Sequence, residues 1–534
     1  MKNIIKKWGM AAGMILSLCS CGNFLEENSQ NMAYLEKVED LDELLLGECY
    51  LKKGYSFNMV DAATPSGWNA VLKSPCFPAI HLMDDDVEEY VYFNRFIQTL
   101  NYPRLQMCNL HYWQKDPFRD SEFKEIEEDN WGSTYRRIAV INTILSDVDG
   151  FRDDDIRNDS ICERIKGEAL FLRAQNYFWL ANLYARPYCK ATAATDVCIP
   201  LKINEAVEGG FFRRSPMEEV YGQIRQDLLD AVEAFRRGHQ EWVYRANQDA
   251  AFALLSRVSL YTERYEEAVS YADSILSNPA YRLLDFNDRQ TGDTTSVMYA
   301  SSPETIFTQG PNIMGVLHCP YTSNRSPQQR YVDGYTSSAD LLACYEENDL
   351  RLDAFFLERE KPTAGKRCVK WRNYTDDDEV SDCWALRLPE VYLNKAEALA
   401  LLGRDGDAIA VIDELRKNRI RNGEMEAISY SGRELVEFIR NERRRELCFE
   451  GHRWFDLRRY AVNTEYPVEK SIEHISLTYV ADGAHEGQKQ GKYVLRPYSE
   501  DAAAYMLPIP RSEIEYNGGD LSNEERIERP LQEI

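Results

Sequence analysis

The densest group of potentially catalytic side chains lies between residues 446 and 459. It consists of Glu446, Glu450, Arg453, Asp456 and Arg459. On a helix, their spacings of three and four residues favour ion pairs along one face. We therefore interpret the group as structural. A glycoside hydrolase needs only two carboxylates at a set separation. The 88 acidic residues leave that alternative open, but no feature of the sequence points to such a pair.

Other signatures of catalysis or metal binding are missing from the sequence. The seven histidines are His81, His111, His239, His318, His452, His474 and His485. None belongs to an H-E-x-x-H motif, and the chain has no G-x-S-x-G elbow, phosphate-binding glycine loop or dinucleotide fingerprint. The 13 cysteines form no C-x-x-C pair, so their spacing suggests neither a zinc site nor a redox motif. We expect a protein that is not an enzyme and has no bound metal.

Runs of acidic residues are the remaining candidates for cation binding. They occur at 84–86, 153–155 and 375–379. We interpret all three as solvated turns, with binding of a cation or a ligand hydroxyl as the alternative. A calcium loop would place ligands at alternating positions and a glycine at the turn, and the 375–379 run has neither. Calcium is therefore possible but is not indicated by the sequence.

The amino-terminal stretch predicts export. Lys2, Lys6 and Lys7 precede an uncharged segment, 8–20, that is too short to span a bilayer as a helix. Leu18 and two small residues then lead to Cys21, which resembles the lipobox of bacterial lipoproteins. Residues 1–20 are thus a predicted lipoprotein signal peptide, with Cys21 acylated and bound to outer-membrane lipid. The alternative is a plain secretory signal; Cys19 fits the pattern less well because bulky Leu18 precedes it. Two glutamates shortly after Cys21 weakly favour display on the surface of a Gram-negative cell.

Composition narrows the function further. Removal of the three signal lysines changes the net charge from −25 to −28. An acidic protein is a poor match for nucleic acid or for an anionic membrane surface, so we expect no nucleic-acid partner. After Ser20 no apolar run is long enough for a membrane crossing. Eleven cysteines remain once Cys19 and Cys21 are set aside, so at least one is free. Buried free thiols are the simplest interpretation.

Apolar periodicity and capping residues predict a mostly helical chain. The expected helices are 31–51, 125–145, 164–184, 215–236 and 434–459, with helix pairs at 247–276 and 384–420. Ser215 is the expected N-cap of the fourth, with Pro216 at its first position. In the two pairs, small residues lie twelve positions apart, as in Ser256 with Ala268 and Ala396 with Ala408. This spacing resembles the tetratricopeptide repeat; two ordinary helical hairpins are the alternative.

Several motifs in one order resemble the SusD/RagB-like family of outer-membrane nutrient-binding lipoproteins. They are W-x3-Y-x2-I-x3-N at 131–142, E-A-x-F-L-R-A with Y-F at 168–178, R-S with V-Y and D-L at 214–228, R-L-P-E-V-Y-L-N-K-A-E-A at 387–398, the 442–459 stretch ending W-F-D-L-R-R, and L-P-I-P at 507–510. Ala185 and Arg186 depart from the family, which often has glycine there. The stretches 55–115 and 285–380 match none of its motifs.

The resemblance implies a fold and a role. We expect a mostly α fold, a scaffold of tetratricopeptide-like helical pairs at about 120–276 and 384–460 within a single domain, 21–534. The variable loop regions, about 55–115 and 281–383, would build the ligand surface. The resemblance also implies no catalysis, an oligosaccharide or in some members a peptide as cargo, and a partner. That partner is a SusC-like, TonB-dependent outer-membrane transporter, which the lipoprotein caps like a lid.

Aromatic residues of the two loop regions are the candidate ligand contacts. A pyranose has a C–H face that covers a Trp or Tyr ring, while its hydroxyls bind polar groups at the edge. The candidates with such neighbours are Trp68, Asn69, Asn109, Tyr112, Trp113, Tyr321, Asn324, Arg325, Tyr331 and Tyr335. Packing inside the loops is the alternative for each. Our hypothesis is a surface lipoprotein that captures an oligosaccharide for a transporter, with peptide capture, a surface glycoside hydrolase and a purely structural lid as competitors.

Overall fold

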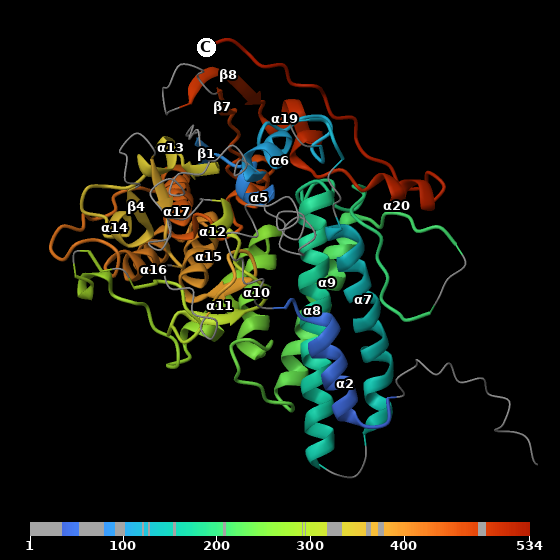
Figure 1. Cartoon of the computed structure of the whole chain (residues 1–534). Helices are drawn as coiled ribbons and strands as arrows, with labels where there is room; N and C mark the ends of the chain where they lie inside the picture. Colours follow the sequence, from blue (N-terminus) through green and yellow to red (C-terminus); the bar gives the residue numbers. More distant parts are fainter. Residues whose placement is uncertain are drawn as a thin grey trace, which may run out of the picture.

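A computed structural model of the chain describes thirteen stretches. They are residues 35–52, 79–90, 102–119, 122–125, 129–152, 156–206, 210–290, 292–293, 295–317, 334–358, 365–371, 379–478 and 487–534. Within them the protein is mostly helical, as predicted, with short strands (Figure 1). None of the described helices combines the length and apolar character that a membrane crossing requires.

The first half of the scaffold is built around α8, Ile156–Tyr184. This helix packs against α7, Asn130–Asp147, on one side and α9, Met217–Phe235, on the other (Figure 1). Its last eighteen residues are buried on all faces, as expected of a helix enclosed by others. Residues 185–216 connect α8 to α9. The prediction that Ser215 caps α9 is wrong by one residue. Pro216 occupies the N-cap position, and the helix begins at Met217.

The two predicted helix pairs form and stack on each other. They consist of α10 (Gln248–Tyr261) with α11 (Tyr265–Leu276), and α15 (Leu388–Leu401) with α16 (Asp405–Arg416). In the first pair the Ser256 hydroxyl donates to the Ala268 carbonyl at 3.1 Å, because both small residues allow close approach. Helix α11 packs on α15, so pairs distant in the sequence form one array, and α10 joins it to α9 (Figure 1).

The carboxyl-terminal charged stretch forms two helices, so the prediction of one helix over 434–459 is wrong. They are α17, Gly432–Leu447, and α18, Arg453–Ala461. Between them Phe449 and Gly451 have positive φ values of 61° and 73°, which end the helical path. A Cβ on Gly451 would lie 3.1 Å from Ile80 Cδ1 and 3.3 Å from Cys383 Cα, so this turn is pressed against two distant segments.

Within the described stretches the strands form four two-stranded antiparallel sheets, and five of the eight strands lie in the regions expected to be loops. They pair β1 (Val87–Tyr90) with β3 (Gly334–Ser337), β2 (Thr305–Thr308) with β6 (Ala385–Arg387), β4 (Phe356–Glu358) with β5 (Lys366–Cys368), and β7 (Ile472–Thr478) with β8 (Gln488–Leu495). The first two sheets join strands that lie far apart in sequence. Tertiary contacts rather than local periodicity therefore stabilise these short strands.

Short helices complete the described parts. They are α2 (Val38–Leu44) with the π-turn Leu45–Cys49, α5 (Ala79–Leu82), α6 (Tyr102–His111), the 3-10 turns Val148–Phe151 and Phe286–Asp288, α12 (Met314–Leu317), α13 (Ala339–Leu342), α14 (Arg351–Phe355), α19 (Tyr498–Asp501), the 3-10 turn Ala502–Tyr505 and α20 (Arg511–Tyr516). Figure 1 shows α5, α6, β1, β7, β8 and α19 gathered at one end of the molecule, near the carboxyl terminus.

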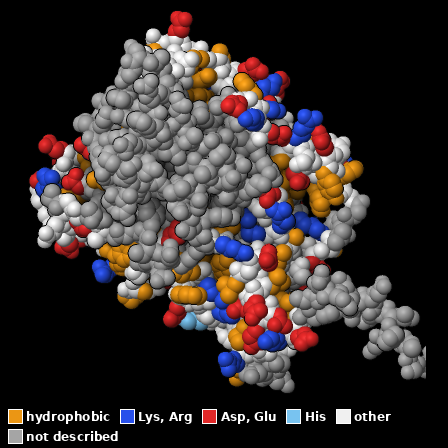
Figure 2. Space-filling view, viewed as in Figure 1, with side chains coloured by type: hydrophobic (Ala, Val, Ile, Leu, Met, Phe, Trp, Pro, Cys, Tyr) orange, Lys and Arg blue, Asp and Glu red, His pale blue; other side chains and the backbone are white. Residues whose placement is uncertain are grey.

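One large hydrophobic core runs from Val38 to Leu521, and a smaller one lies beneath α15 to α17. Six of the nine cysteines within the described stretches are buried. On the face shown in Figure 2, acidic and basic side chains are intermingled wherever residues are described. The described part of this face therefore offers no extended basic surface.

Candidate functional site

Most of the residues predicted to bind ligand or lipid lie outside the described stretches. They are Cys21, Trp68, Asn69, Tyr321, Asn324, Arg325 and Tyr331. Their roles stay predictions. The remaining four candidates, Asn109, Tyr112, Trp113 and Tyr335, are described and can be compared with the expectation that they lie in open loops.

That expectation is wrong for these four residues. Asn109 lies on helix α6, and its amide donates to the Arg119 carbonyl at 2.8 Å. Trp113 and Tyr335 are 0% exposed and Tyr112 is 6% exposed. The face of Tyr112 stacks on Tyr493, with ring centroids 4.2 Å apart, and its hydroxyl binds Glu89. In this structure no ring face of the three aromatic residues is open to a sugar.

Packing against the carboxyl-terminal hairpin buries these rings. His474 of β7 stacks between His111, at 3.8 Å, and Trp113, at 4.2 Å between ring centroids. The Trp113 indole donates to the Met83 carbonyl at 2.8 Å, and its φ of 51° turns the chain at the end of α6. The Tyr335 and His111 rings meet in an edge-type arrangement, with centroids 4.9 Å apart. Since β7 lies about 360 residues beyond α6, sequence patterns near Trp113 carry no sign of this cover.

The five charged residues that resembled a catalytic group are structural, as predicted. Asp456 and Arg459 pair along α18 at 2.7 Å, whereas the other three pair with residues distant in the sequence. Glu446 is fully buried and accepts hydrogen bonds from Arg387 at 2.9 Å and Arg419 at 3.0 Å. Glu450 binds Lys370 at 2.7 Å and the same Arg387 at 2.6 Å. Their cationic partners lie on β6 and on the segments just after β5 and α16, so the cluster connects these parts to α17 and to the turn that follows it.

The acidic run at 84–86 is buried, which contradicts its interpretation as a solvated turn. Asp85 binds Arg453 through both carboxylate oxygens, at 2.6 and 2.8 Å, and Asp86 binds Arg444 at 2.7 Å. Burial alone would raise the pKa of Asp85, but the nearby Arg453 and Arg444 guanidinium groups hold it well below its usual value. The run therefore attaches the amino-terminal segment to α17 and α18.

Glu397 is a buried carboxylate whose lowered pKa makes the expected stability of the charged scaffold depend on pH. Its carboxylate accepts hydrogen bonds from Arg459 at 2.7 Å and Arg440 at 3.1 Å. Burial alone would raise the pKa of Glu397, but these guanidinium groups outweigh burial and lower it to about 2. A carboxyl group whose pKa is lower in the folded state stabilises that state at pH values above its pKa in the unfolded chain. This stabilisation is lost as the pH falls through the pKa of the folded state.

We expect Glu397→Gln to be less stable than the wild type by an amount that depends on pH. The difference in free energy of unfolding should be constant above pH 5 and should narrow between about pH 4.5 and 2, because protonation removes the same charge from the wild type. Urea denaturation across this range measures the difference. A difference in free energy of unfolding that stays constant down to pH 2 would show that Glu397 is not an ionised carboxylate with a lowered pKa.

A surface pocket of about 410 Å³ opens between α17, α18 and the segment around α19. Among the residues that line it are Arg440, Arg444, Arg453, Tyr460, Lys470, Tyr498 and Tyr505. Its volume falls in the range of small-ligand sites. One face of Tyr505 is covered by Trp454, with centroids 5.3 Å apart and rings nearly parallel. Three cations of the wall, Arg444, Arg453 and Lys470, are largely neutralised. They share the carboxylates of Asp85, Asp86 and Asp340.

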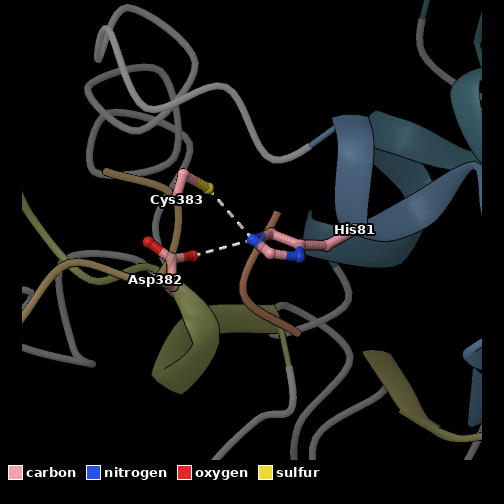
Figure 3. A group of neighbouring side chains, drawn as sticks. All are labelled: His81, Asp382 and Cys383. Atoms are coloured by element: carbon pink, nitrogen blue, oxygen red, sulfur yellow. Dashed lines mark hydrogen bonds and ion pairs between the residues drawn. The ribbon is translucent and has the colours of Figure 1, made fainter. Parts of the chain in front are cut away.

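One group of potential metal ligands occurs among the described residues. His81 Nε2 lies 2.9 Å from Asp382 Oδ2 and 3.2 Å from Cys383 Sγ, and Figure 3 shows both groups directed at this nitrogen. All three side chains are buried. The histidine is on α5, and the other two residues precede β6. Sequence reasoning missed the group because its members are about 300 residues apart and form no spaced motif.

Two family models match the chain in succession. A model described as starch-binding associating with outer membrane matches residues 83–260, and one described as SusD family matches residues 326–524. SusD-like protein P2 of Formosa agariphila is 23% identical over 449 residues, which are 74% of this chain and 79% of that protein. SusD-like protein P38 of the same organism is 38% identical over 77 residues, 13% of this chain and 15% of that protein.

Solved structures share the fold over nearly the whole chain. A SusD-like carbohydrate binding protein from Bacteroides vulgatus aligns with 90% of this chain and 97% of its own, at 23% identity and a TM-score of 0.62. A putative sugar binding protein from the same organism aligns with 93% of this chain and 100% of its own, at 20% identity and a TM-score of 0.65. Identities this low establish the fold alone.

Proposed function

Because the chain belongs to the SusD/RagB-like family, we propose that it is a cell-surface lipoprotein that binds an extracellular oligosaccharide and delivers it to a TonB-dependent outer-membrane transporter. The observation that carries this proposal is the succession of two family models over the scaffold, one of which is described as starch-binding and associated with the outer membrane. The names of the similar solved structures, which are called carbohydrate or sugar binding, support it.

We propose that the protein binds its cargo without cleaving or otherwise altering it. The charged residues that most resembled a catalytic group are engaged in buried ion pairs, and their partners occupy the carboxylate oxygens. A general acid and its partner carboxylate must instead face a substrate. The proposed binding surface consists of Trp68, Asn69, Tyr321, Asn324, Arg325 and Tyr331, in the two regions that match no family motif.

The same proposal includes a lipid anchor and a transporter partner. Cys21 would be acylated after removal of residues 1–20, and the lipid would hold the protein to the outer membrane. A SusC-like transporter would lie beneath it and receive the cargo. Co-purification of such a transporter with the protein from solubilised membranes tests this part. Calcium is no part of the proposal. Asp85 and Asp86 of the 84–86 run pair with arginines, and the runs at 153–155 and 375–378 lie outside the described residues.

Ligand binding separates the competing functions. We expect the purified protein to be retained by immobilised oligosaccharides and not by peptide mixtures, and to release no new reducing ends on incubation with the glycan it binds. Trp68→Ala should weaken binding at least tenfold, because stacking on one ring is a large share of sugar affinity. The matched control is Trp242→Ala, a ring that is 63% exposed in the segment after α9 and is not assigned to the site.

Other outcomes favour the alternatives. Retention on peptides alone would support peptide capture, which uses hydrogen bonds to an extended backbone and side-chain pockets. New reducing ends would support a surface glycoside hydrolase. Absence of binding to either class would support a purely structural lid. Equal loss of affinity in the Trp68 and Trp242 variants would contradict the choice of site but not the family.

A further inference from the structure

We propose that His81, Asp382 and Cys383 bind a single zinc-like divalent transition-metal ion in the interior of the protein. The three candidate ligand atoms, His81 Nε2, Asp382 Oδ2 and Cys383 Sγ, lie within 4.8 Å of one another (Figure 3). Tetrahedral zinc with its usual bond lengths separates such ligand atoms by about 3.3–3.6 Å. The distances from the imidazole nitrogen, 2.9 and 3.2 Å, are shorter by only a few tenths of an ångström.

The charge environment of Asp382 is the second observation. This carboxylate is 0% exposed, and its Oδ1 atom has no hydrogen-bond partner among the described residues. Other buried carboxylates nearby bind permanent cations: Asp85 binds Arg453, and Glu450 binds Arg387 and Lys370. Within the described stretches Asp382 has only the His81 imidazole as an ion-pair partner. A buried carboxylate with an orphan oxygen is costly, and a bound cation would compensate that charge.

The types of ligand select the class of metal. Thiolate and imidazole are ligands of zinc and similar transition metals, whereas calcium and magnesium prefer oxygen. All three side chains are buried, which favours an ion that stabilises the fold. The ion would tie α5 to the segment that leads into β6, next to the Gly451 turn, which contacts both Ile80 and Cys383.

Metal content and cobalt substitution test the site on the purified protein. We expect about one zinc per chain by elemental analysis, loss of the zinc on treatment with a chelator, and a lower melting temperature for the stripped protein. Titration of the stripped protein with Co²⁺ should produce thiolate-to-cobalt charge-transfer absorption. Absence of bound metal together with absence of this band on titration would overturn the proposal, and this readout needs no variant to fold.

Single substitutions locate the ion. Cys383→Ser should abolish the charge-transfer band, and His81→Gln and Asp382→Asn should each weaken Co²⁺ binding at least tenfold. The matched control is Cys49→Ser, because this buried free thiol lies on a different segment of the core. Circular dichroism confirms that each variant is folded. A folded Cys383→Ser protein that keeps the full band would place the metal elsewhere and refute the assignment.

Discussion

Replacing Glu446 with glutamine is expected to lower the free energy of unfolding by about 3–5 kcal/mol. Glutamine keeps the volume of the side chain but removes its charge and one acceptor position. Arg351, Arg387 and Arg419 would then remain buried around a neutral amide. Because Arg351 and Arg419 are 0% exposed, water cannot replace the lost carboxylate. The large effect thus comes from uncompensated buried charge and not from a cavity.

Chemical denaturation of the wild type and the variant measures this change. The control is Glu515→Gln, which removes the same charge from an exposed pair with Arg511, whose side chains are 88% and 63% exposed. We expect that control to cost less than about 1 kcal/mol, since solvent screens surface pairs. A cost for Glu446→Gln as small as that of the control would mean that the cluster is hydrated and does not hold the scaffold together.

Gly238→Ala is expected to destabilise the protein by about 3 kcal/mol, at the upper end of the usual range for overpacking. Gly238 lies just beyond α9, where the turn presses on α8. A Cβ at this position would lie 2.1 Å from Arg164 N and 2.7 Å from Arg164 Cα. These are backbone atoms of a helix, so no side-chain rotation can relieve the clash. The turn would have to move away from the central helix of the scaffold.

Gly222→Ala provides the matched control for this prediction. Gly222 is exposed within α9, and a Cβ there has no neighbour within 4 Å. Alanine in a helix is favoured over glycine, so the control should gain up to about 1 kcal/mol. Thermal and urea unfolding of both variants gives the comparison. A Gly238→Ala protein at least as stable as the wild type would contradict the close packing of α9 on α8.

The helical scaffold could be predicted from the sequence because its determinants are local. Apolar residues at helical spacing predicted the helices, and small residues twelve apart in each pair predicted the contact between them. The break at Phe449 and Gly451 was missed because the charged residues on both sides continue a helical spacing. The turn is set by packing against Ile80 and Cys383, which local periodicity does not encode.

The environment of the aromatic and acidic candidates could not be predicted for a similar reason. A tryptophan after a short helix has the same local sequence whether it is open or covered. Its cover, His474, comes from a hairpin near the end of the chain. Likewise the acidic run at 84–86 resembles a solvated turn until Arg444 and Arg453 are placed beside it. Long-range packing therefore decided burial at both positions.

By itself, the amino-acid sequence determined the helical scaffold and the family of this protein, since both depend on spacings within segments of a few tens of residues. The tertiary structure alone decided which charges are buried together, which rings are covered, and that His81 meets Asp382 and Cys383. These outcomes depend on contacts between residues hundreds of positions apart. Such contacts form when the helical array closes its core, and no local pattern specifies them.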